Sequence, residues 1–202
     1  MKKIYIFFFL VLLQHLFFSQ SKTNAILEKI PWKKWSEIEA LQAKEPRAVM
    51  VWIYADWCSH CKDLKEQSLS DKNVIRALCS DKVYVVKLNV EEKNDIIYKG
   101  KVYKYVPATK EKKAYHELAF AMMHNTPGIP SLVFFDENLR LLQELKGFRN
   151  PNDLQIIMPY FFERKYVSMN WADYAKNIKL TTSTADISTL ENFSNNSDTC
   201  KD

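Results

Sequence analysis

The sequence predicts an α/β fold in which helices flank a central β-sheet. Four short apolar runs have the composition of strands, at residues 47–54, 83–89, 131–135 and 139–145. The last two runs are separated by a few turn residues and so form an antiparallel hairpin. The first run leads into Cys58 at the start of a segment with helical patterning, so a strand, a turn and a helix meet at a cysteine.

Six segments have the patterning or the end signals of helices. They lie at residues 36–44, 58–67, 71–79, 115–124, 150 onward and 171–178. Ser36 and Glu39 have the spacing of a capping box, which predicts that the first helix opens there. Asn150 followed by Pro151 is a typical helix start, and Pro159 is expected to kink or break that helix.

The first twenty residues have the pattern of a signal peptide. Lys2 and Lys3 form a positive start, and residues 4–13 are an apolar run, shorter than the ~20 residues of a membrane-spanning helix. We expect cleavage near Ser19 or Gln20, with an uncleaved N-terminal anchor as the alternative. Export implies a periplasmic or secreted protein in an oxidising compartment.

The remaining chain is long enough for one domain, predicted at residues 21–180, and a flexible tail at 181–202 that is rich in Ser, Thr and Asn. The net charge of the 202 residues is +5, with acidic and basic residues interspersed, so we expect no nucleic-acid partner. Cys79 is expected to be a buried, inert thiol, and Cys200 a free thiol or an intermolecular partner.

The Cys-x-x-Cys pair is predicted to be redox-active because of its place in the chain. A helix N-terminus offers unpaired N–H groups and the positive end of the helix dipole, both of which favour a thiolate. Only the first cysteine lies at that end. Cys58 is therefore expected to be the partly exposed nucleophile, and Cys61, one turn further, the resolving thiol.

Three other uses of such a pair fit less well. A zinc site needs four ligands, and the remaining cysteines and histidines lack suitable spacing: Cys79, Cys200, His116 and His124. Haem attachment requires His where this chain has Lys62. A structural disulfide across so short a loop gains little stabilisation. We therefore expect no metal and no cofactor.

Three segments resemble the thioredoxin superfamily. Residues 54–62 (Tyr-Ala-Asp-Trp-Cys-Ser-His-Cys-Lys) resemble its active-site segment, residues 87–90 its central strand, and residues 128–135 (Gly-Ile-Pro-Ser-Leu-Val-Phe-Phe) its cis-proline loop. They occur in the family's order and cover about residues 47–166. The lead-in is similar to that of thioredoxin-like domains of bacterial envelope proteins, including the C-terminal domain of DsbD. The resemblance implies a thioredoxin fold with a mixed central sheet.

The resemblance also suggests roles around the thiols. Ile129–Pro130 would be cis and would leave neighbouring backbone groups free to pair with an extended substrate. Trp57 would pack beside the thiol. His60 would place positive charge near the Cys58 thiolate, which lowers the pKa of Cys58 and makes the couple more oxidising.

One position departs from the family pattern. The superfamily usually buries an Asp six residues before its first cysteine, to assist proton transfer to the resolving thiol. This chain has Trp52 there, so Lys87, which matches the usual partner of that Asp, lacks its mate. We expect the mixed disulfide to resolve more slowly, or through water or Glu91.

The chain is longer than the resemblance requires at about residues 93–125, before the cis-proline loop. Residues 94–107 contain two alternating runs around Lys-Gly and predict an inserted hairpin, followed by a basic loop at 110–113 and the helix at 115–124. The insertion either shapes a groove for a partner or is a plain surface elaboration.

Together these features predict an exported thiol–disulfide oxidoreductase that exchanges disulfides with protein substrates through Cys58 and Cys61. A reductase or isomerase is favoured over an oxidase. Its partners would be protein thiols and disulfides and an upstream redox partner, a membrane-bound one included. The alternative is a non-catalytic binding module that presents the insertion to a protein partner. Oligomeric state is not predicted.

Overall fold

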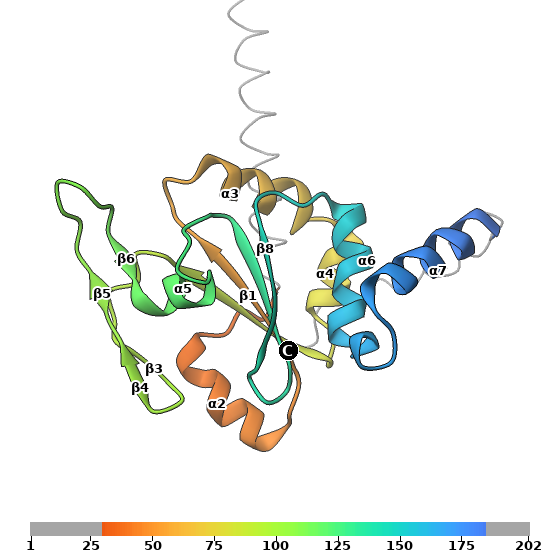
Figure 1. The fold of residues 1–202 in the computed structure, drawn as a ribbon, viewed down its shortest axis with the longest axis horizontal. Coiled ribbons are helices and arrows are strands. Elements are labelled where there is room, and N and C mark those ends of the chain that lie inside the picture. Colours follow the sequence, from red (N-terminus) through yellow and green to blue (C-terminus); the bar gives the residue numbers. More distant parts are fainter. Residues whose placement is uncertain (1–29, 185–202) are drawn as a thin grey trace, which may run out of the picture.

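The computed structural model describes residues 30–184, so the predicted signal peptide and most of the predicted tail lie outside the described residues. Its centre is a four-stranded mixed sheet of strands β1 (Ala48–Tyr54), β2 (Val83–Asn89), β7 (Ser131–Phe135) and β8 (Leu141–Lys146). The strand order is β2-β1-β7-β8 (Figure 1). β1 is parallel to β2, and β7 is antiparallel to both β1 and β8. The four predicted strands and the hairpin are confirmed.

β8 begins two residues later than predicted. The carboxylate of Asp136 accepts hydrogen bonds from the backbone N–H groups of Asn138 and Arg140, and this turn uses the residues that would otherwise extend the strand. Leu139, in the same turn, has a positive φ of 56°. Hydrogen bonds that an Asp side chain accepts from nearby backbone N–H groups compete with strand pairing in this way.

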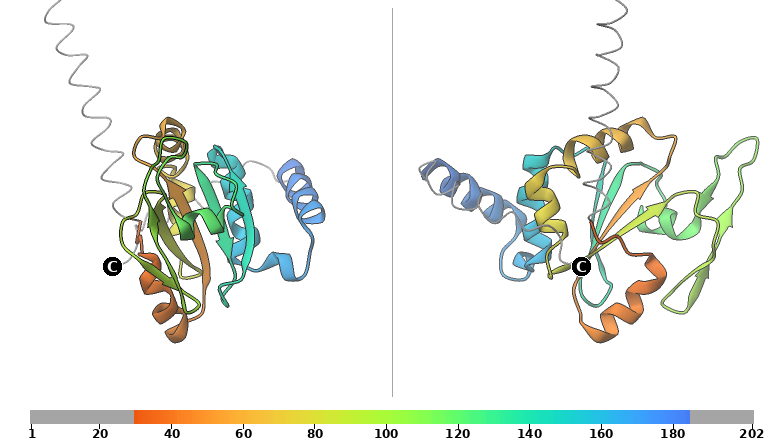
Figure 2. Two further views of the ribbon diagram at one scale, coloured as in Figure 1. Left: turned by 60° about the vertical axis from the view of Figure 1, so that its left-hand side comes forward. Right: turned by 180° about the vertical axis from the view of Figure 1, so that it is seen from behind.

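Helices cover both sides of the sheet. The α-helices are α2 (Trp35–Lys44), α3 (Ser59–Asp63), α4 (Lys72–Leu78), α5 (Glu117–Met122), α6 (Pro151–Phe162) and α7 (Trp171–Thr184), with a π-helical turn η1 (Leu64–Ser68) after α3 and a 3-10 turn η2 (Lys165–Val167) after α6. α4 and α6 lie together on one side of the sheet and α2 on the other (Figures 1 and 2). No helix within residues 30–184 combines the length and apolarity needed to cross a membrane.

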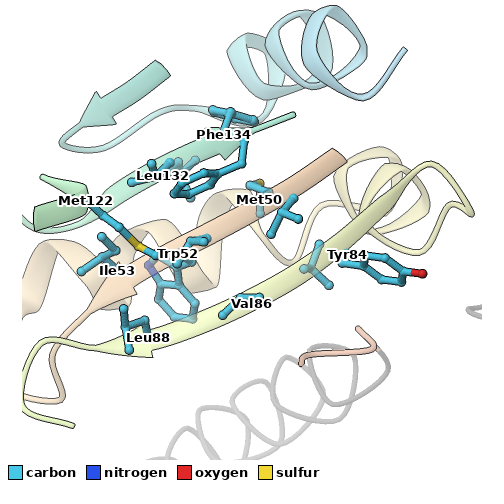
Figure 3. Close-up of a cluster of buried hydrophobic side chains, with 14 of the residues drawn as sticks. Met50, Trp52, Ile53, Tyr84, Val86, Leu88, Met122, Leu132 and Phe134 are labelled. Atoms are coloured by element: carbon cyan, nitrogen blue, oxygen red, sulfur yellow. The ribbon is translucent and has the colours of Figure 1, made fainter. Parts of the chain in front are cut away.

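The core lies on the central strands. β1 is buried over its whole length except at Tyr54. Apolar side chains from three strands meet there, among them Met50, Trp52, Val86, Leu88, Leu132 and Phe134 (Figure 3). Phe134 stacks on Phe161 of α6, with ring centroids 4.4 Å apart, and Phe135 packs on Trp35 of α2 at 5.2 Å. Burial of these apolar surfaces is the main favourable term in folding.

The predicted helix cap at Ser36 is wrong. α2 begins at Trp35, and the carboxylate of Glu37 accepts a hydrogen bond of 2.6 Å from the backbone N–H of Lys34. Trp35 is buried against β7 and the insertion, and a helix that includes it places its indole toward the core. Packing therefore moves the helix start upstream of the capping sequence.

Of the two effects expected at Pro159, a kink or a break, the break is wrong, because α6 continues through it to Phe162. The start is as predicted: the side chain of Asn150 accepts a hydrogen bond from the backbone N–H of Asp153. Proline removes one hydrogen bond of the helical ladder. Phe161 and Phe162, beyond the proline, are buried, and their packing offsets that loss.

The insertion contains two small antiparallel pairs. β3 (Ile96–Tyr98) and β4 (Lys101–Tyr103) form the predicted hairpin, whose turn residues Lys99 and Gly100 have positive φ angles of 51° and 74°. β5 (Tyr105–Val106) then pairs with β6 (Tyr115–His116). The predicted helix at 115–124 therefore starts two residues late, because its first residues belong to β6.

α7 runs to residue 184, beyond the predicted end at 178.

Candidate active site

The two cysteines of the pair lie where β1 passes into α3. Cys58 is the N-cap residue of α3, and its backbone N–H donates to the carbonyl of Ala55 at 3.1 Å. The Sγ of Cys58 accepts a hydrogen bond of 3.1 Å from the backbone N–H of Cys61. The two sulfurs form a disulfide, with Cα atoms 5.2 Å apart. An N–H group of the first helical turn is thus aimed at the first sulfur.

Both cysteines are buried, so the expected partial exposure of Cys58 is wrong. Cys58 is 6% exposed and Cys61 2% exposed. The reason is that the Cys58 sulfur is bonded to Cys61 and turned against the first turn of α3. Cys58 remains the more accessible of the two.

The cis-proline loop lies at the same end of the sheet. The Ile129–Pro130 peptide is cis, as predicted. Pro130 directly precedes β7, whose first residue Ser131 pairs with Ile53 near the end of β1. The C-terminal end of β1 leads to Cys58. The cis-proline loop and the cysteine pair therefore lie at the same end of the sheet. Ile129 is half-buried and Pro130 is buried.

Trp57 is exposed beside the pair rather than packed in the core. Its exposed fraction is 51%. The ammonium group of Lys113, from the insertion, lies 4.3 Å from the centroid of the Trp57 ring. The basic loop was noted in the sequence, but no local pattern relates two residues so far apart in the chain.

His60 lies on the solvent side of α3. Its side chain is largely exposed, and its Nδ1 is 3.4 Å from the carboxylate of Asp63, one turn along the helix. Asp56, before Trp57, is also exposed and accepts a hydrogen bond of 3.1 Å from the side-chain amide of Asn89 on β2. Carboxylates therefore lie next to both ends of the active-site segment.

Trp52, on β1, lies in the hydrophobic core. It is 5% exposed, its ring stacks on Tyr54 at 4.7 Å, and Trp32 lies at 5.8 Å. Its indole N–H is buried without a hydrogen-bond partner. Lys87 is opposite Trp52 in the β1–β2 register, and it is exposed. Burial raises the pKa of the neighbouring Tyr54 hydroxyl above its ordinary value.

The third described cysteine differs from expectation. Cys79, at the C-terminal end of α4, is half-buried and disulfide-bonded, so the expectation of a buried, inert thiol is wrong. Cys200 lies outside the described residues.

Comparison with known proteins places this site in a family. The family model of the thioredoxin-like domain matches residues 34–162, and the chain therefore belongs to the thioredoxin-like family. Its fold is a thioredoxin fold with a mixed central sheet flanked by helices, as predicted.

Two curated relatives are thiol:disulfide interchange proteins DsbD. The protein from Pectobacterium atrosepticum is 27% identical over 151 residues, which cover 71% of this chain and 21% of the relative. The protein from Actinobacillus pleuropneumoniae is 27% identical over 116 residues, which cover 56% of this chain and 16% of the relative. The chain thus spans about a fifth of the length of these relatives.

Among solved structures, a thioredoxin-fold protein from Helicobacter pylori matches with a TM-score of 0.51 and 15% identity. The match covers 79% of this chain and 93% of that protein. It supports the fold.

Proposed function

We propose that this protein is a thiol–disulfide oxidoreductase that exchanges disulfides with protein substrates. The observation that carries the proposal is the Cys58–Cys61 disulfide at the start of α3, with the Cys61 N–H donating to the Cys58 sulfur. In the reduced protein the same N–H group and the helix N-terminus stabilise a Cys58 thiolate. The family membership of residues 34–162 supports this chemistry.

The reaction takes two steps of thiol–disulfide exchange. The Cys58 thiolate attacks one sulfur of a substrate disulfide, forms a mixed disulfide and releases the other substrate sulfur as a thiolate. Cys61, as a thiolate, then attacks the Cys58 sulfur and releases the second substrate thiolate. Two electrons pass to the substrate, and Cys58 and Cys61 end as the observed disulfide. An upstream dithiol protein must then reduce this pair.

The neighbouring residues support the two steps. An extended substrate strand would pair with the backbone of Ile129, at the end of the sheet where β1 leads to Cys58, because the carbonyl of Pro130 already accepts a hydrogen bond from the Gly147 N–H. Trp57 offers a flat, half-exposed ring next to the nucleophile. His60 and Lys87 are both exposed, and the Lys87 ammonium group and a protonated His60 would favour the thiolate forms from the solvent side.

We propose that the protein works in the cell envelope as a reductase or isomerase. The curated relatives are interchange proteins of the DsbD type, and the first twenty residues have the pattern of an export signal. In that compartment, proteins without a dedicated reductant become oxidised. An upstream redox partner, soluble or membrane-bound, would keep the pair reduced.

The experiment compares variants of the two cysteines in the reduction of insulin disulfides. The wild type should reduce insulin with a dithiol reductant. Cys58→Ser should abolish the reaction, because it removes the nucleophile. Cys61→Ser should instead accumulate a mixed disulfide with the substrate, visible by mass spectrometry. The reduction potential of the pair then decides direction: a value near that of thioredoxin, about −270 mV, supports a reductase.

The competing function is a binding module that displays the insertion. It would be favoured if both cysteine variants bound substrate proteins as the wild type does and none of the three proteins exchanged disulfides. Mixed-disulfide trapping by Cys61→Ser alone is incompatible with that alternative.

A further inference from the structure

The positive charge of this protein is concentrated in the insertion. Residues 93–125 contain seven lysines against three carboxylates, so they hold a net charge of +4 out of the chain's +5. The rest of the chain is close to neutral. The insertion is therefore the part of the molecule that attracts anionic groups.

The base of the insertion is firmly attached to the body of the fold. His116 is fully buried, and its backbone N–H donates to the carbonyl of Val90, just beyond β2. Its ring nitrogens bond to the Asn94 carbonyl at 3.1 Å and to the Leu118 N–H at 3.2 Å. These contacts give the base of the insertion a defined position on the body of the fold.

The basic loop, residues 110–113, follows Thr109 and projects between β5 and β6. The backbone N–H of Thr109 donates to the carbonyl of Lys112 at 2.8 Å, and the Thr109 hydroxyl accepts from the Lys112 N–H at 3.1 Å. This turn leaves Lys110, Lys112 and Lys113 exposed. Glu111 in the same turn reduces the net charge of the loop to +2.

Lys113 connects the basic loop to the active site. Its ammonium group lies 4.3 Å from the centroid of the Trp57 ring, within the range of a cation–π contact. Trp57 directly precedes Cys58. The contact therefore places positive charge beside the nucleophile from a segment that is remote in sequence.

We propose that the basic loop is a specificity element that selects protein substrates with acidic residues flanking the target disulfide. The proposal rests on the proposed function and names its substrate class. Charges on an exposed loop act over a Debye length of about 10 Å, so carboxylates next to a disulfide seated at Cys58 fall within the range of Lys113, which lies against Trp57. Asp56, the carboxylate next to Trp57 in sequence, accepts a hydrogen bond from Asn89, and Lys113 lies over the Trp57 ring.

The test uses two peptides with the same disulfide, one flanked by Glu and one by Lys. For the wild type, kcat/KM should be roughly tenfold higher for the acidic peptide at low ionic strength, within the range of electrostatic steering, and the preference should shrink as salt is added. The triple variant Lys110→Gln, Lys112→Gln, Lys113→Gln should lose most of the preference. Lys113→Arg should keep it, since arginine retains the charge and the contact with Trp57.

The matched control removes the same charge elsewhere. Lys44, Lys72 and Lys176 are exposed on α2, α4 and α7, and their triple change to Gln should leave the preference intact. A third peptide with uncharged flanks gives the reference rate for each protein, and the preference is compared after division by that rate, so that an effect of Lys113 on the thiols themselves cancels.

Three results would overturn the inference: equal rates of the wild type on both charged peptides, a preference retained by the loop variant, or a preference lost by the control. A loop that bound anionic lipid vesicles without any peptide preference would also overturn it, in favour of a membrane contact. If the wild type reduced none of the peptides, the proposed function itself would fail. Retained activity on the uncharged peptide separates the two cases.

Discussion

At the scale of single residues, Trp52 is the most consequential departure from the family pattern. It fills an interior position with a large ring that stacks on Tyr54, and its indole N–H is buried without a partner. An unpaired buried donor costs free energy, and its packing offsets that cost. Trp52 therefore contributes to stability at a position that is usually used for proton transfer.

Trp52→Asp should lower the free energy of unfolding by about 3–5 kcal/mol, because it removes a large buried side chain. It should also speed resolution of a mixed disulfide near neutral pH, since a carboxylate would accept the proton of Cys61. Stopped-flow measurement of that step tests the second part. Trp52→Asn is the matched control, because it creates a similar cavity without an acidic group. Equal rates for the two variants would show that proton transfer follows another route.

His116 predicts a pH dependence of stability. Its Nδ1 accepts from the Leu118 N–H, so the folded state requires a neutral ring, and burial lowers the pKa of His116 below its ordinary value. Glu92, Asp95 and Glu117 face it and oppose that shift. Below about pH 6.5 the unfolded chain therefore binds the proton more readily, and stability falls as the pH falls.

Urea unfolding between pH 7.5 and 5 should show this loss in the wild type. His116→Asn should flatten the profile, because asparagine does not titrate there and is a good helix cap. His60→Asn, which removes an exposed histidine, should keep the wild-type slope. The same slope in all three proteins would mean that His116 does not set the pH dependence.

At the scale of elements, α6 tolerates a proline in its interior because of its packing. Pro159→Ala should raise the free energy of unfolding by about 1 kcal/mol, since alanine restores a backbone donor and relieves the clash of the ring with the preceding turn. Pro151→Ala, at the first helical position, should have little effect, because no donor is needed there. Chemical denaturation measures both. A destabilised Pro159→Ala protein would show that the half-buried ring contributes packing that outweighs the missing hydrogen bond.

The elements that sequence predicted well are those set by local signals. Apolar runs located all four strands of the central sheet, and Asn150 with Pro151 located the start of α6. The helix start at Trp35 was missed because tertiary burial outweighed a capping pattern at Ser36.

In the site, the cysteine pair and the cis peptide were predictable because their residues form recognisable short motifs. The burial of Cys58 and the contact between Lys113 and Trp57 were not, because both depend on how distant segments pack. Local motifs therefore identify the candidate site residues. The residues that surround the two sulfurs are determined by tertiary packing.

At the scale of the whole molecule, the core and the net positive charge lie in different parts of the chain. The central sheet and its helices hold the core, while the insertion carries most of the net charge and reaches the active site through one lysine. Changes to exposed lysines of the insertion remove no core side chain. Substrate preference is therefore expected to change more readily than the fold.

The two edges of the central sheet differ in what they offer to another chain. Beside β2, Lys33 forms a bridge with Val86, and its backbone N–H donates to the carbonyl of Val85. β8 has no neighbouring strand on its outer side in the described part of the chain, and it borders a hollow of about 460 Å³ lined partly by Leu142. An open edge beside apolar side chains is where chains add to one another. β8 is therefore the strand of the central sheet to which another chain is expected to add.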